Sequence, residues 1–252
     1  MHLFFDLDGT LTDPFEGITR CIAHALAVMG RPCPPLAELR WCIGPPLRKS
    51  LAVLLGTDDD KLVEETVSVY RERFGSVGLF ENRVYDGIPE MLQTLSSFGH
   101  TLYVATAKPW IFAERIVDHF GLSGHFKGIY GCELDGARGD KASLIAHILD
   151  AESIDSSETA MIGDREHDII GAKANRIPAF GVLWGYGTRD ELEASGARAC
   201  FGSPREIPTA FNGKSDSKSL SFPSNSAADR AGPTGKGAPV FLDRTRPGSR
   251  RR

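Results

Sequence analysis

The sequence predicts an α/β protein in which a parallel sheet carries helices on both faces and a helical segment is inserted near the start of the chain. Two observations carry this prediction. Beyond residue 86, short apolar segments alternate with segments of helical periodicity, which is typical of a parallel sheet. Before that, residues 14–78 show apolar residues at helical spacing only. The 252-residue chain has room for one domain with such an insert.

The first expected strand is the apolar run Leu3–Phe5, which stops at an acidic turn containing Gly9. In the segment that follows, apolar residues three or four positions apart mark helices, and several prolines punctuate them. About 65 residues without a strand are expected to form a separate small helical unit. The helical spacing is carried by residues 18, 22, 26 and 29, by residues 47, 51, 54 and 55, and by residues 62, 66, 69 and 74.

The rest of the chain is expected to alternate between helices and strands. The capping-box pattern occurs at Thr188–Glu191 and at Ser203–Glu206, and each occurrence predicts a short helix. The other expected helices cover residues 88–98, 109–120, 141–149 and 168–175, and the expected strands cover residues 102–105, 128–131, 159–162 and 180–183.

The net charge of −4 is unevenly distributed. Residues 207–252 carry nine Lys and Arg against three Asp and Glu, whereas residues 1–206 carry twenty against thirty. The C-terminal part is rich in Ser, Gly, Pro, Lys and Arg, so residues 208–252 are expected to form a disordered basic tail. The acidic body argues against nucleic acid as a partner.

Composition also bears on location. An apolar share of 41% allows an ordinary core, yet no apolar run approaches the ~20 residues of a membrane span. The N-terminus has no basic region of the kind that begins a secretory signal. The five cysteines include no C-x-x-C pair and are expected to be reduced thiols. We therefore expect a cytoplasmic protein without a membrane partner.

Polar groups of complementary chemistry follow four of the expected strands. Ligands of parallel α/β sheets bind at the carboxyl ends of the strands, so these groups are expected to meet. Singly each signal is weak, because an Asp-x-Asp pair is a common turn stabiliser and an acid before a helix is a common N-cap. The informative feature is that all of these groups occur together in one chain, in order along it, after four expected strands. The residues are Asp6, Asp8, Thr106, Lys141, Asp164 and Asp168.

This set of residue types matches the needs of phosphoryl transfer. A phosphate group requires a hard cation held by carboxylates, a nucleophile in line with the leaving oxygen, and a proton donor for that oxygen. Asp6 is the candidate nucleophile, forming an aspartyl-phosphate, and Asp8 is the candidate acid–base group. Asp164 is expected to complete a Mg²⁺ site, and Thr106 and Lys141 to hold the phosphate.

The same residues carry a family resemblance. The sequence resembles the haloacid dehalogenase (HAD) superfamily, and most closely its phosphoglycolate-phosphatase-like branch, which also includes 5'-nucleotidases. The resemblance covers residues 3–207. Its four motifs are FDLDGTLTD at residues 5–13, VATAK at 104–108, Lys141 in GDKASLI, and MIGDREHDIIGAK at 161–173.

The resemblance implies a Rossmann-like core of residues 1–13 and 85–207, and a helical cap of residues 14–84, called the cap below. It also implies a Mg²⁺-dependent aspartyl-phosphate mechanism. The implied roles are nucleophile and metal ligand for Asp6, acid–base group and backbone metal ligand for Asp8, phosphate binding for Thr106 and Lys141, metal binding for Asp164, and support of the metal or of Lys141 for Asp168.

The sequence departs from the branch in motif two, where Ala107 replaces the asparagine of many phosphoglycolate phosphatases, which leaves the substrate open. In the cap, Arg48 and Lys49 follow the family-like segment 43–47 and are candidates to contact an anionic leaving group, although both equally fit a solvated helix end. The oligomeric state is not indicated by any of these features.

The expected function is therefore hydrolysis of a small phosphorylated metabolite, with phosphoglycolate first and a nucleoside monophosphate as the alternative. A dehalogenase needs no Asp8, so that residue argues against dehalogenation. A phosphomutase keeps both aspartates and differs only in kinetics. A catalytically silent phosphate-sensing protein is expected to have lost Asp6, Asp8 or Lys141, and all three are present.

Overall fold

A six-stranded parallel sheet forms the centre of the computed structural model, which describes residues 1–212. The predicted α/β class with a parallel sheet is confirmed. The strand order is β5-β4-β1-β6-β7-β8, so the first strand of the chain lies inside the sheet. The strands are β1 His2–Phe5, β4 Thr101–Pro109, β5 Phe126–Cys132, β6 Thr159–Gly163, β7 Ala179–Val182 and β8 Ala199–Phe201.

The register of β1 explains how distant motifs meet. Phe5 at its end lies opposite Val104 of β4 and Ile162 of β6. The next residue, Asp6, therefore emerges between the ends of two neighbouring strands. The apolar residues of β1 are fully buried, as expected for a parallel sheet that is covered on both faces.

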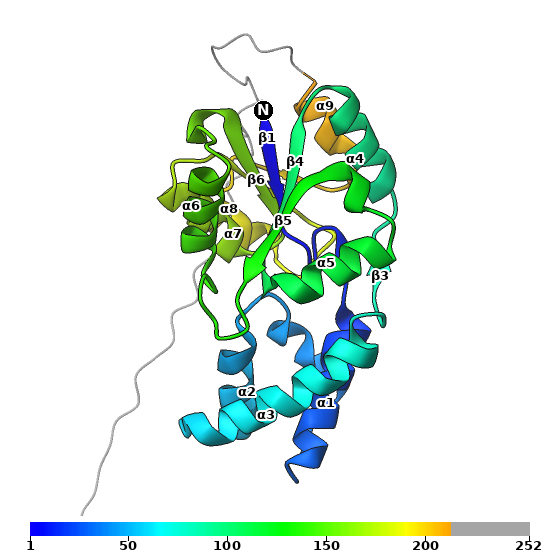
Figure 1. Ribbon diagram of the computed structural model, residues 1–252, viewed down its shortest axis with the longest axis vertical. Helices are drawn as coiled ribbons and strands as arrows, with labels where there is room; N and C mark the ends of the chain where they lie inside the picture. The colour runs from blue at the N-terminus through cyan, green and yellow to red at the C-terminus, as the bar shows by residue number, and fades with distance from the viewer. Residues whose placement is uncertain (213–252) are drawn as a thin grey trace, which may run out of the picture. The chain divides into compact units, whose positions relative to one another are not determined.

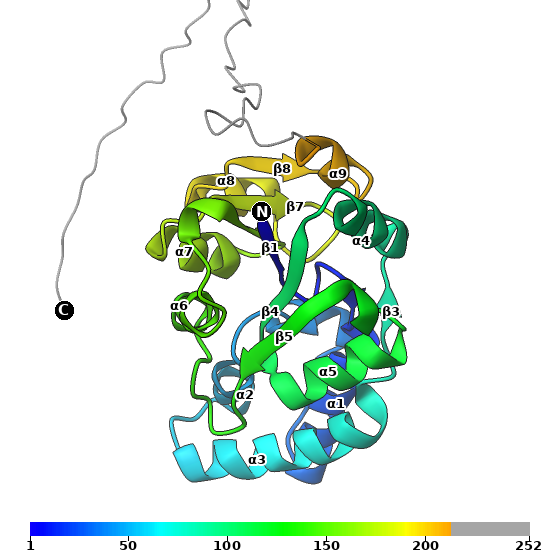
Figure 2. The ribbon, with the colours of Figure 1, turned by 45° about the horizontal axis from the view of Figure 1, so that its top comes forward.

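Helices cover both faces of the sheet. Figures 1 and 2 show α4, α5 and α9 on one face, and α6, α7 and α8 on the other. On the second face, Phe4 packs in one apolar cluster with Leu144 and Ile148 of α6 and Ile169 of α7. The bounds are α4 Ile88–Ser97, α5 Trp110–His119, α6 Lys141–Ala151, α7 Glu166–Ala174, α8 Arg189–Ser195 and α9 Glu206–Ala210, with short 3₁₀ turns η3 Ser123–His125 and η4 Ser156–Glu158.

The cap consists of helices that lie at the carboxyl ends of the strands (Figure 1). Its connections to the core pair as a short antiparallel ribbon of β2 and β3. Asp59 begins one helix by accepting a hydrogen bond from the Lys61 amide. The elements are β2 Thr12–Asp13, α1 Phe15–Val28, η1 Leu36–Cys42, α2 Leu47–Leu55, α3 Asp60–Arg73, the π-helical turn η2 Phe74–Gly78, and β3 Arg83–Val84.

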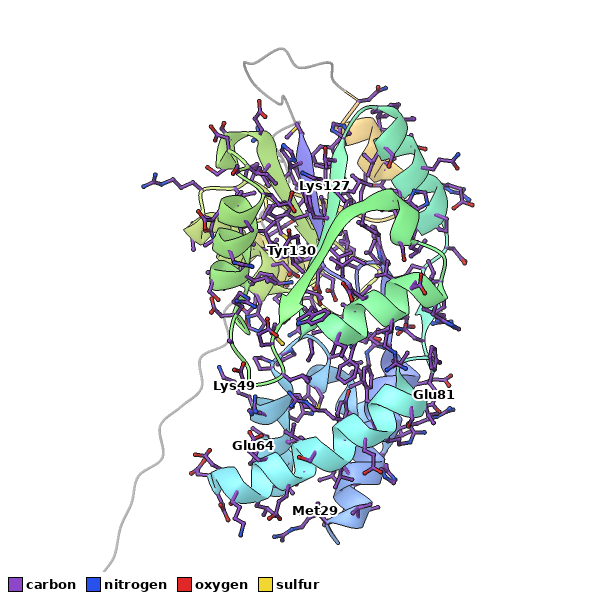
Figure 3. All side chains as sticks on the ribbon, in the orientation of Figure 1. Met29, Lys49, Glu64, Glu81, Lys127 and Tyr130 are labelled. Atoms are coloured by element: carbon purple, nitrogen blue, oxygen red, sulfur yellow. The ribbon has the colours of Figure 1, made fainter. Side chains whose placement is uncertain are left out.

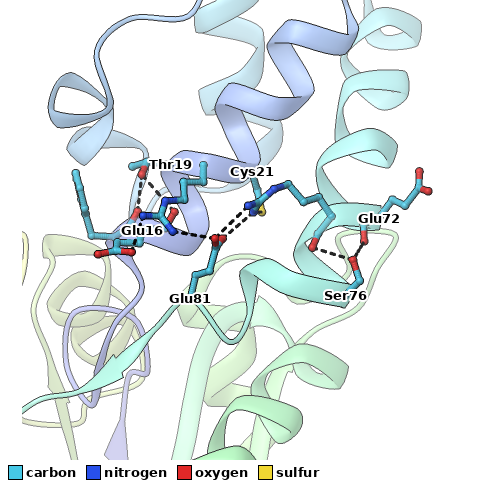
Figure 4. Close-up of polar contacts among 9 residues, drawn as sticks. Glu16, Thr19, Cys21, Glu72, Ser76 and Glu81 are labelled. Carbon is cyan, nitrogen blue, oxygen red and sulfur yellow. Dashed lines mark hydrogen bonds and ion pairs between the residues drawn. The ribbon is translucent and has the colours of Figure 1, made fainter.

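Glu81 ties the return connection to two cap helices (Figure 4). Its carboxylate pairs with Arg20 of α1 at 2.9 Å and with Arg73 of α3 at 2.7 Å. Its backbone carbonyl accepts from the Gly17 amide at 2.9 Å. The cap helices are thus fixed to one another next to the segment that leads back into the core.

Several elements differ from the expectation. Strand β4 continues through Thr106 to Pro109, because its pairing with β5 is irregular after Ala105 and resumes at Pro109. The short helix predicted at Thr188 is present with Thr188 as its N-cap, since the Thr188 side chain accepts from the Glu191 amide. The Glu191 carboxylate, which was expected to complete that capping box, accepts from the Arg165 side chain and from the Glu166 amide. The short helix predicted at Ser203 is present as α9, but its capping box is wrong, because α9 begins after Arg205 without a side-chain cap.

The C-terminal end of the described chain is folded further than the expected tail boundary at residue 208. Helix α9 runs to Ala210, and Phe211 is buried against His100 and Phe180. The remainder of that expected tail, residues 213–252, lies outside the described residues. All five cysteines are free thiols. In residues 1–212, every helix is too short or too polar to cross a bilayer.

Candidate active site

Three carboxylates from different motifs meet at the carboxyl end of the sheet. Asp6 follows β1, Asp164 follows β6, and Asp168 lies in the first turn of α7. Oxygen atoms from the three side chains all lie within 4.8 Å of one another. The residues are 6%, 0% and 1% exposed, respectively. The predicted convergence of the N-terminal and later acids is therefore present.

The turn after β1 is shaped for close approach to Asp164. The Leu7 carbonyl accepts hydrogen bonds from the amides of Thr10, Leu11 and Thr12, which folds the chain back on itself. Gly9 has a φ of +90°, and a Cβ there would overlap the Asp164 carboxylate. Glycine at this position therefore permits both the turn and the contact.

Lys141 neutralises part of this acidic cluster from the first turn of α6. Its ammonium group lies 2.9 Å from Asp6 Oδ1, 2.7 Å from Asp168 Oδ1 and 2.8 Å from the Ala105 carbonyl. Burial alone lowers the pKa of Lys141, but the Asp168 and Asp6 carboxylates outweigh it and raise the pKa above its ordinary value. Two of the three ammonium protons are donated to Asp6 and to the Ala105 carbonyl, and the ion pair with Asp168 lies beside them.

Asp164 remains without an ion-pair partner among residues 1–212. Its carboxylate accepts from the Tyr186 amide at 2.8 Å and from Thr10 Oγ1 at 3.4 Å. Burial, and then the charges of Asp6 and Asp168, raise its pKa well above the ordinary value. Three buried carboxylates with one lysine between them leave excess negative charge.

This donor set fits a hard divalent cation. Carboxylate oxygens are the ligands that Mg²⁺ prefers, and a cation between Asp6 and Asp164 would offset their repulsion. Asp168 already pairs with Lys141 and also accepts from the Arg165 amide at 3.2 Å. Its position thus suits support of Lys141, one of the two roles that were expected for it.

Asp8 has a lysine of its own, which the sequence analysis did not assign to the site. Lys108 Nζ lies 2.8 Å from Asp8 Oδ2, and both side chains are largely buried. The other carboxylate oxygen, Oδ1, is buried and has no hydrogen-bond partner among the described residues. Burial raises the pKa of Asp8, and the Lys108 charge opposes that shift. A carboxyl group with a raised pKa and one free oxygen suits proton transfer.

Thr106 lies near the same place in β4. It is buried, and its Oγ1 accepts from the Lys108 amide at 3.3 Å. Thr106, Lys141, Asp6 and Asp8 all line one cavity of about 1080 Å³ between the core and the cap. The predicted phosphate-binding roles of Thr106 and Lys141 remain predictions.

The two cap cations that were predicted for substrate binding differ in their surroundings. Arg48 forms an ion pair with Glu64 of α3 and donates to the Asp135 carbonyl at 3.4 Å. Lys49 also lines the cavity but has no ion pair among the described residues. Figure 3 shows Lys49 beside α2, on the same side of the molecule as Glu64. Lys49 is therefore the freer of the two to meet an anion.

Arginines cross between the cap and the core on both sides of the cavity. Arg71 of α3 donates to the Leu134 carbonyl at 2.7 Å, and Arg165 donates to the Ile43 carbonyl at 2.7 Å. Both hydrogen bonds join residues that are far apart in the sequence, and in both the acceptor is a backbone carbonyl. No sequence motif could have indicated them.

Comparisons with known proteins agree with this geometry. A family model described as "Haloacid dehalogenase-like hydrolase" matches residues 3–182. A 5'-nucleotidase of Pseudomonas aeruginosa is 52% identical over 193 residues, which cover 77% of this chain and 87% of that protein. A crystal structure of a predicted phosphatase from Clostridium acetobutylicum has a TM-score of 0.80 and 38% identity, covering 83% of this chain and 97% of that one.

Other relatives have different names. The tyrosine-protein kinase PtkA of Mycobacterium tuberculosis is 38% identical over 192 residues, which cover 76% of this chain but only 65% of that protein. A phosphoglycolate phosphatase of Xanthomonas campestris is 28% identical over 189 residues, which cover 75% of this chain and 86% of that protein.

Proposed function

Since the chain belongs to the haloacid dehalogenase-like hydrolase family and is a phosphatase of that family, we propose that it hydrolyses nucleoside 5'-monophosphates. The size and lining of the cavity carry this proposal. It begins at the acidic cluster and, at about 1080 Å³, has the size of sites that enclose drug-sized ligands. A 52% identical relative named 5'-nucleotidase supports the same substrate class.

One part of the cavity lining, called the apolar wall below, consists of apolar and aromatic side chains of the cap and of α5. It combines aliphatic side chains with the rings of Tyr70, Phe74 and Phe112. A nucleoside presents a flat base and a sugar that gain from such a surface, because aromatic rings pack favourably against aromatic and apolar groups. Glycolate is small and charged, and it would fill little of a cavity of about 1080 Å³. The aliphatic members include Ile18 of α1, Leu47 of α2 and Val67 of α3.

The proposed mechanism uses the carboxylates in separate roles. An oxygen of Asp6 attacks phosphorus while Asp8 gives its proton to the leaving nucleoside oxygen, so that an aspartyl-phosphate and a free nucleoside form. Asp8 then takes a proton from the water that attacks phosphorus, which releases inorganic phosphate and restores Asp6. Lys141 holds the Asp6 carboxylate at 2.9 Å. A Mg²⁺ ion bound by Asp6, Asp164 and the Asp8 backbone would supply charge neutralisation for the phosphate.

Hydrolysis is expected to depend on Mg²⁺. Excess chelator should reduce release of inorganic phosphate from a nucleoside monophosphate to the background rate, and added Mg²⁺ should restore it. Asp164→Asn removes a charge from the cluster and should raise the Mg²⁺ concentration at half-maximal rate about tenfold or more. Asp190→Asn, an exposed change on α8, is the matched control. Equal turnover in chelator would contradict the metal assignment.

Filling the apolar wall is expected to change substrate preference. The unsubstituted enzyme should prefer a nucleoside 5'-monophosphate over 2-phosphoglycolate in kcat/KM. Val67 lines the cavity and is only 1% exposed, so urea unfolding must first show that Val67→Phe is folded as the unsubstituted enzyme is. The folded variant should lower this preference about tenfold, mainly through KM for the nucleotide. Val53→Phe makes the same change at an exposed position of α2 outside the cavity lining, and it should leave the preference unaltered. A preference that is insensitive to Val67→Phe would argue against this wall as the nucleoside site.

A second candidate substrate is 2-phosphoglycolate. Lys49 in the cavity lining favours it, because Lys49 has no ion pair within residues 1–212 and could pair with a carboxylate. In that case the unsubstituted enzyme would prefer 2-phosphoglycolate, and Lys49→Gln would raise KM for it alone. Transfer of phosphate to a protein tyrosine, instead of its release, would point to the activity that the name of the kinase relative describes.

We also propose a cytoplasmic enzyme without a nucleic-acid partner, which the acidic composition of residues 1–206 supports.

A further inference from the structure

We propose that Lys108 is a positioning residue that holds the Asp8 carboxylate for proton transfer and is itself held by the cap through the ring of Phe74. The inference rests on the proposed phosphatase mechanism, in which Asp8 exchanges a proton with the leaving group. It does not depend on the identity of that group. It joins the acid–base residue of the core to a single aromatic side chain of the cap.

The contact on the core side is an ion pair shielded from water. Lys108 Nζ lies 2.8 Å from Asp8 Oδ2, with 6% of the lysine and 12% of the aspartate side chain exposed. Only one of the two carboxylate oxygens is used, and Asp8 Oδ1 has no partner among the described residues. The ammonium group thus fixes the rotation of the carboxylate and leaves the other oxygen for the leaving group.

The contact on the cap side is a cation–π interaction. The Lys108 ammonium lies 4.4 Å from the centre of the Phe74 ring. That ring is itself constrained, because it stacks on Tyr70 at 5.4 Å and meets Phe112 edge-on at 5.4 Å. Phe74 begins the π-helical turn η2. Such turns occur often at functional sites.

The two buried lysines of the site have separate partners. Among residues 1–212, Lys141 pairs with Asp6 and Asp168, whereas Lys108 pairs with Asp8 alone. Asp8, Lys108 and Phe74 all line the cavity that receives the substrate. A buried ion pair by itself is weak evidence for stability, and this pair lies in the lining of the cavity beside the candidate nucleophile Asp6. The arrangement is therefore better explained by control of the Asp8 orientation.

The dependence of rate on the leaving group tests this role. A leaving group that is a weak acid needs the proton from Asp8 as the P–O bond breaks, whereas 4-nitrophenolate leaves without it. In Lys108→Met we expect kcat/KM for phenyl phosphate to fall at least tenfold and kcat/KM for 4-nitrophenyl phosphate to fall less than about threefold, because general acid catalysis contributes ~10²–10⁴-fold only where a proton is required. The ratio kcat/KM is used because it reports the steps up to release of the leaving group, whereas hydrolysis of the aspartyl-phosphate is common to both substrates. Lys108→Arg should recover part of the loss.

Two further variants separate positioning from structure. In an Asp8→Asn background, Lys108→Met should add almost no further loss, because the two residues act as a unit. Phe74→Leu removes the ring but keeps an apolar side chain, and it should cause a smaller loss with the same leaving-group dependence. Phe80→Leu, which removes an exposed cap ring that pairs with Arg115, is the matched control and should not alter that dependence.

The outcomes are distinguishable. Equal losses of kcat/KM on the two aryl phosphates, or additive losses in the Asp8→Asn background, would each overturn the role of Lys108 while leaving the phosphatase mechanism intact. Absence of phosphate release by the unsubstituted enzyme from either compound would refute the mechanism and this inference with it. Preference for 2-phosphoglycolate over nucleotides would change the substrate assignment only.

Discussion

Replacing Asp6 with asparagine is expected to reduce kcat below about 1% of the unsubstituted rate while the fold is retained. An amide is a far weaker nucleophile than a carboxylate, and loss of a covalent nucleophile usually costs several orders of magnitude. The fold should survive because the substituted side chain has the same shape and its amide oxygen can still accept the 2.9 Å hydrogen bond from Lys141.

Acid quenching during turnover of a labelled substrate measures the intermediate directly. The unsubstituted enzyme should carry covalently bound phosphate under these conditions, and Asp6→Asn should carry none. Urea unfolding and circular dichroism should show that the variant is folded, and Asp190→Asn on α8 again serves as the control for a change of aspartate to asparagine. A variant that retains more than about 1% of the rate, or that still traps phosphate, would exclude Asp6 as the nucleophile.

Local patterns were sufficient to predict most of the core. The apolar runs that became β1, β6 and β7 are continuous because a parallel sheet is buried on both faces, and this gives a strong signal in a single sequence. The end of β4 was misjudged because Thr106–Pro109 joins the sheet through an irregular pairing with β5, and register is a property of two strands together. The Ser203 capping box failed because the chain enters α9 in a helical turn at Arg205.

The residues of the candidate site that follow the end of a strand could be predicted from the sequence. The contacts that depend on how two separate elements pack against each other could not. Asp6 and Asp164 follow adjacent strands, so their meeting is a consequence of sheet topology. The ion pair of Lys108 with Asp8 also follows from sheet topology, because Asp8 follows β1 and Lys108 lies at the end of the adjacent strand β4. The contact of Lys108 with Phe74 instead depends on how the cap packs against the core. The pairing of Arg48 with Glu64 likewise depends on the packing of α2 against α3. Neither of these two cap contacts corresponds to a residue spacing that could be recognised in the sequence.

Replacing Lys141 with methionine is expected to lower the free energy of unfolding by about 3–5 kcal/mol and to abolish activity. The ion pairs of Lys141 with Asp6 and Asp168 are nearly inaccessible to water, with 4%, 9% and 2% of the three side chains exposed. Removing one partner of such a group leaves buried charges without compensation, which costs far more than the intact pair contributes. The methionine keeps most of the packing volume, so the loss reports mainly on charge.

A second substitution separates charge from chemistry. Adding Asp168→Asn to Lys141→Met removes one of the uncompensated charges, so the double variant should regain about half of the lost stability. It should remain inactive, because Asp6 still lacks the group that holds its carboxylate at 2.9 Å. Urea unfolding in chelator measures these free energies, since Mg²⁺ bound to the folded state would mask part of the loss. Lys61→Met on α3 is the exposed control and should change stability by less than about 0.5 kcal/mol. If Lys141→Met behaved like that control, the three carboxylates would have to be protonated or neutralised by another group, and a nucleophilic role for Asp6 would no longer be consistent with the site.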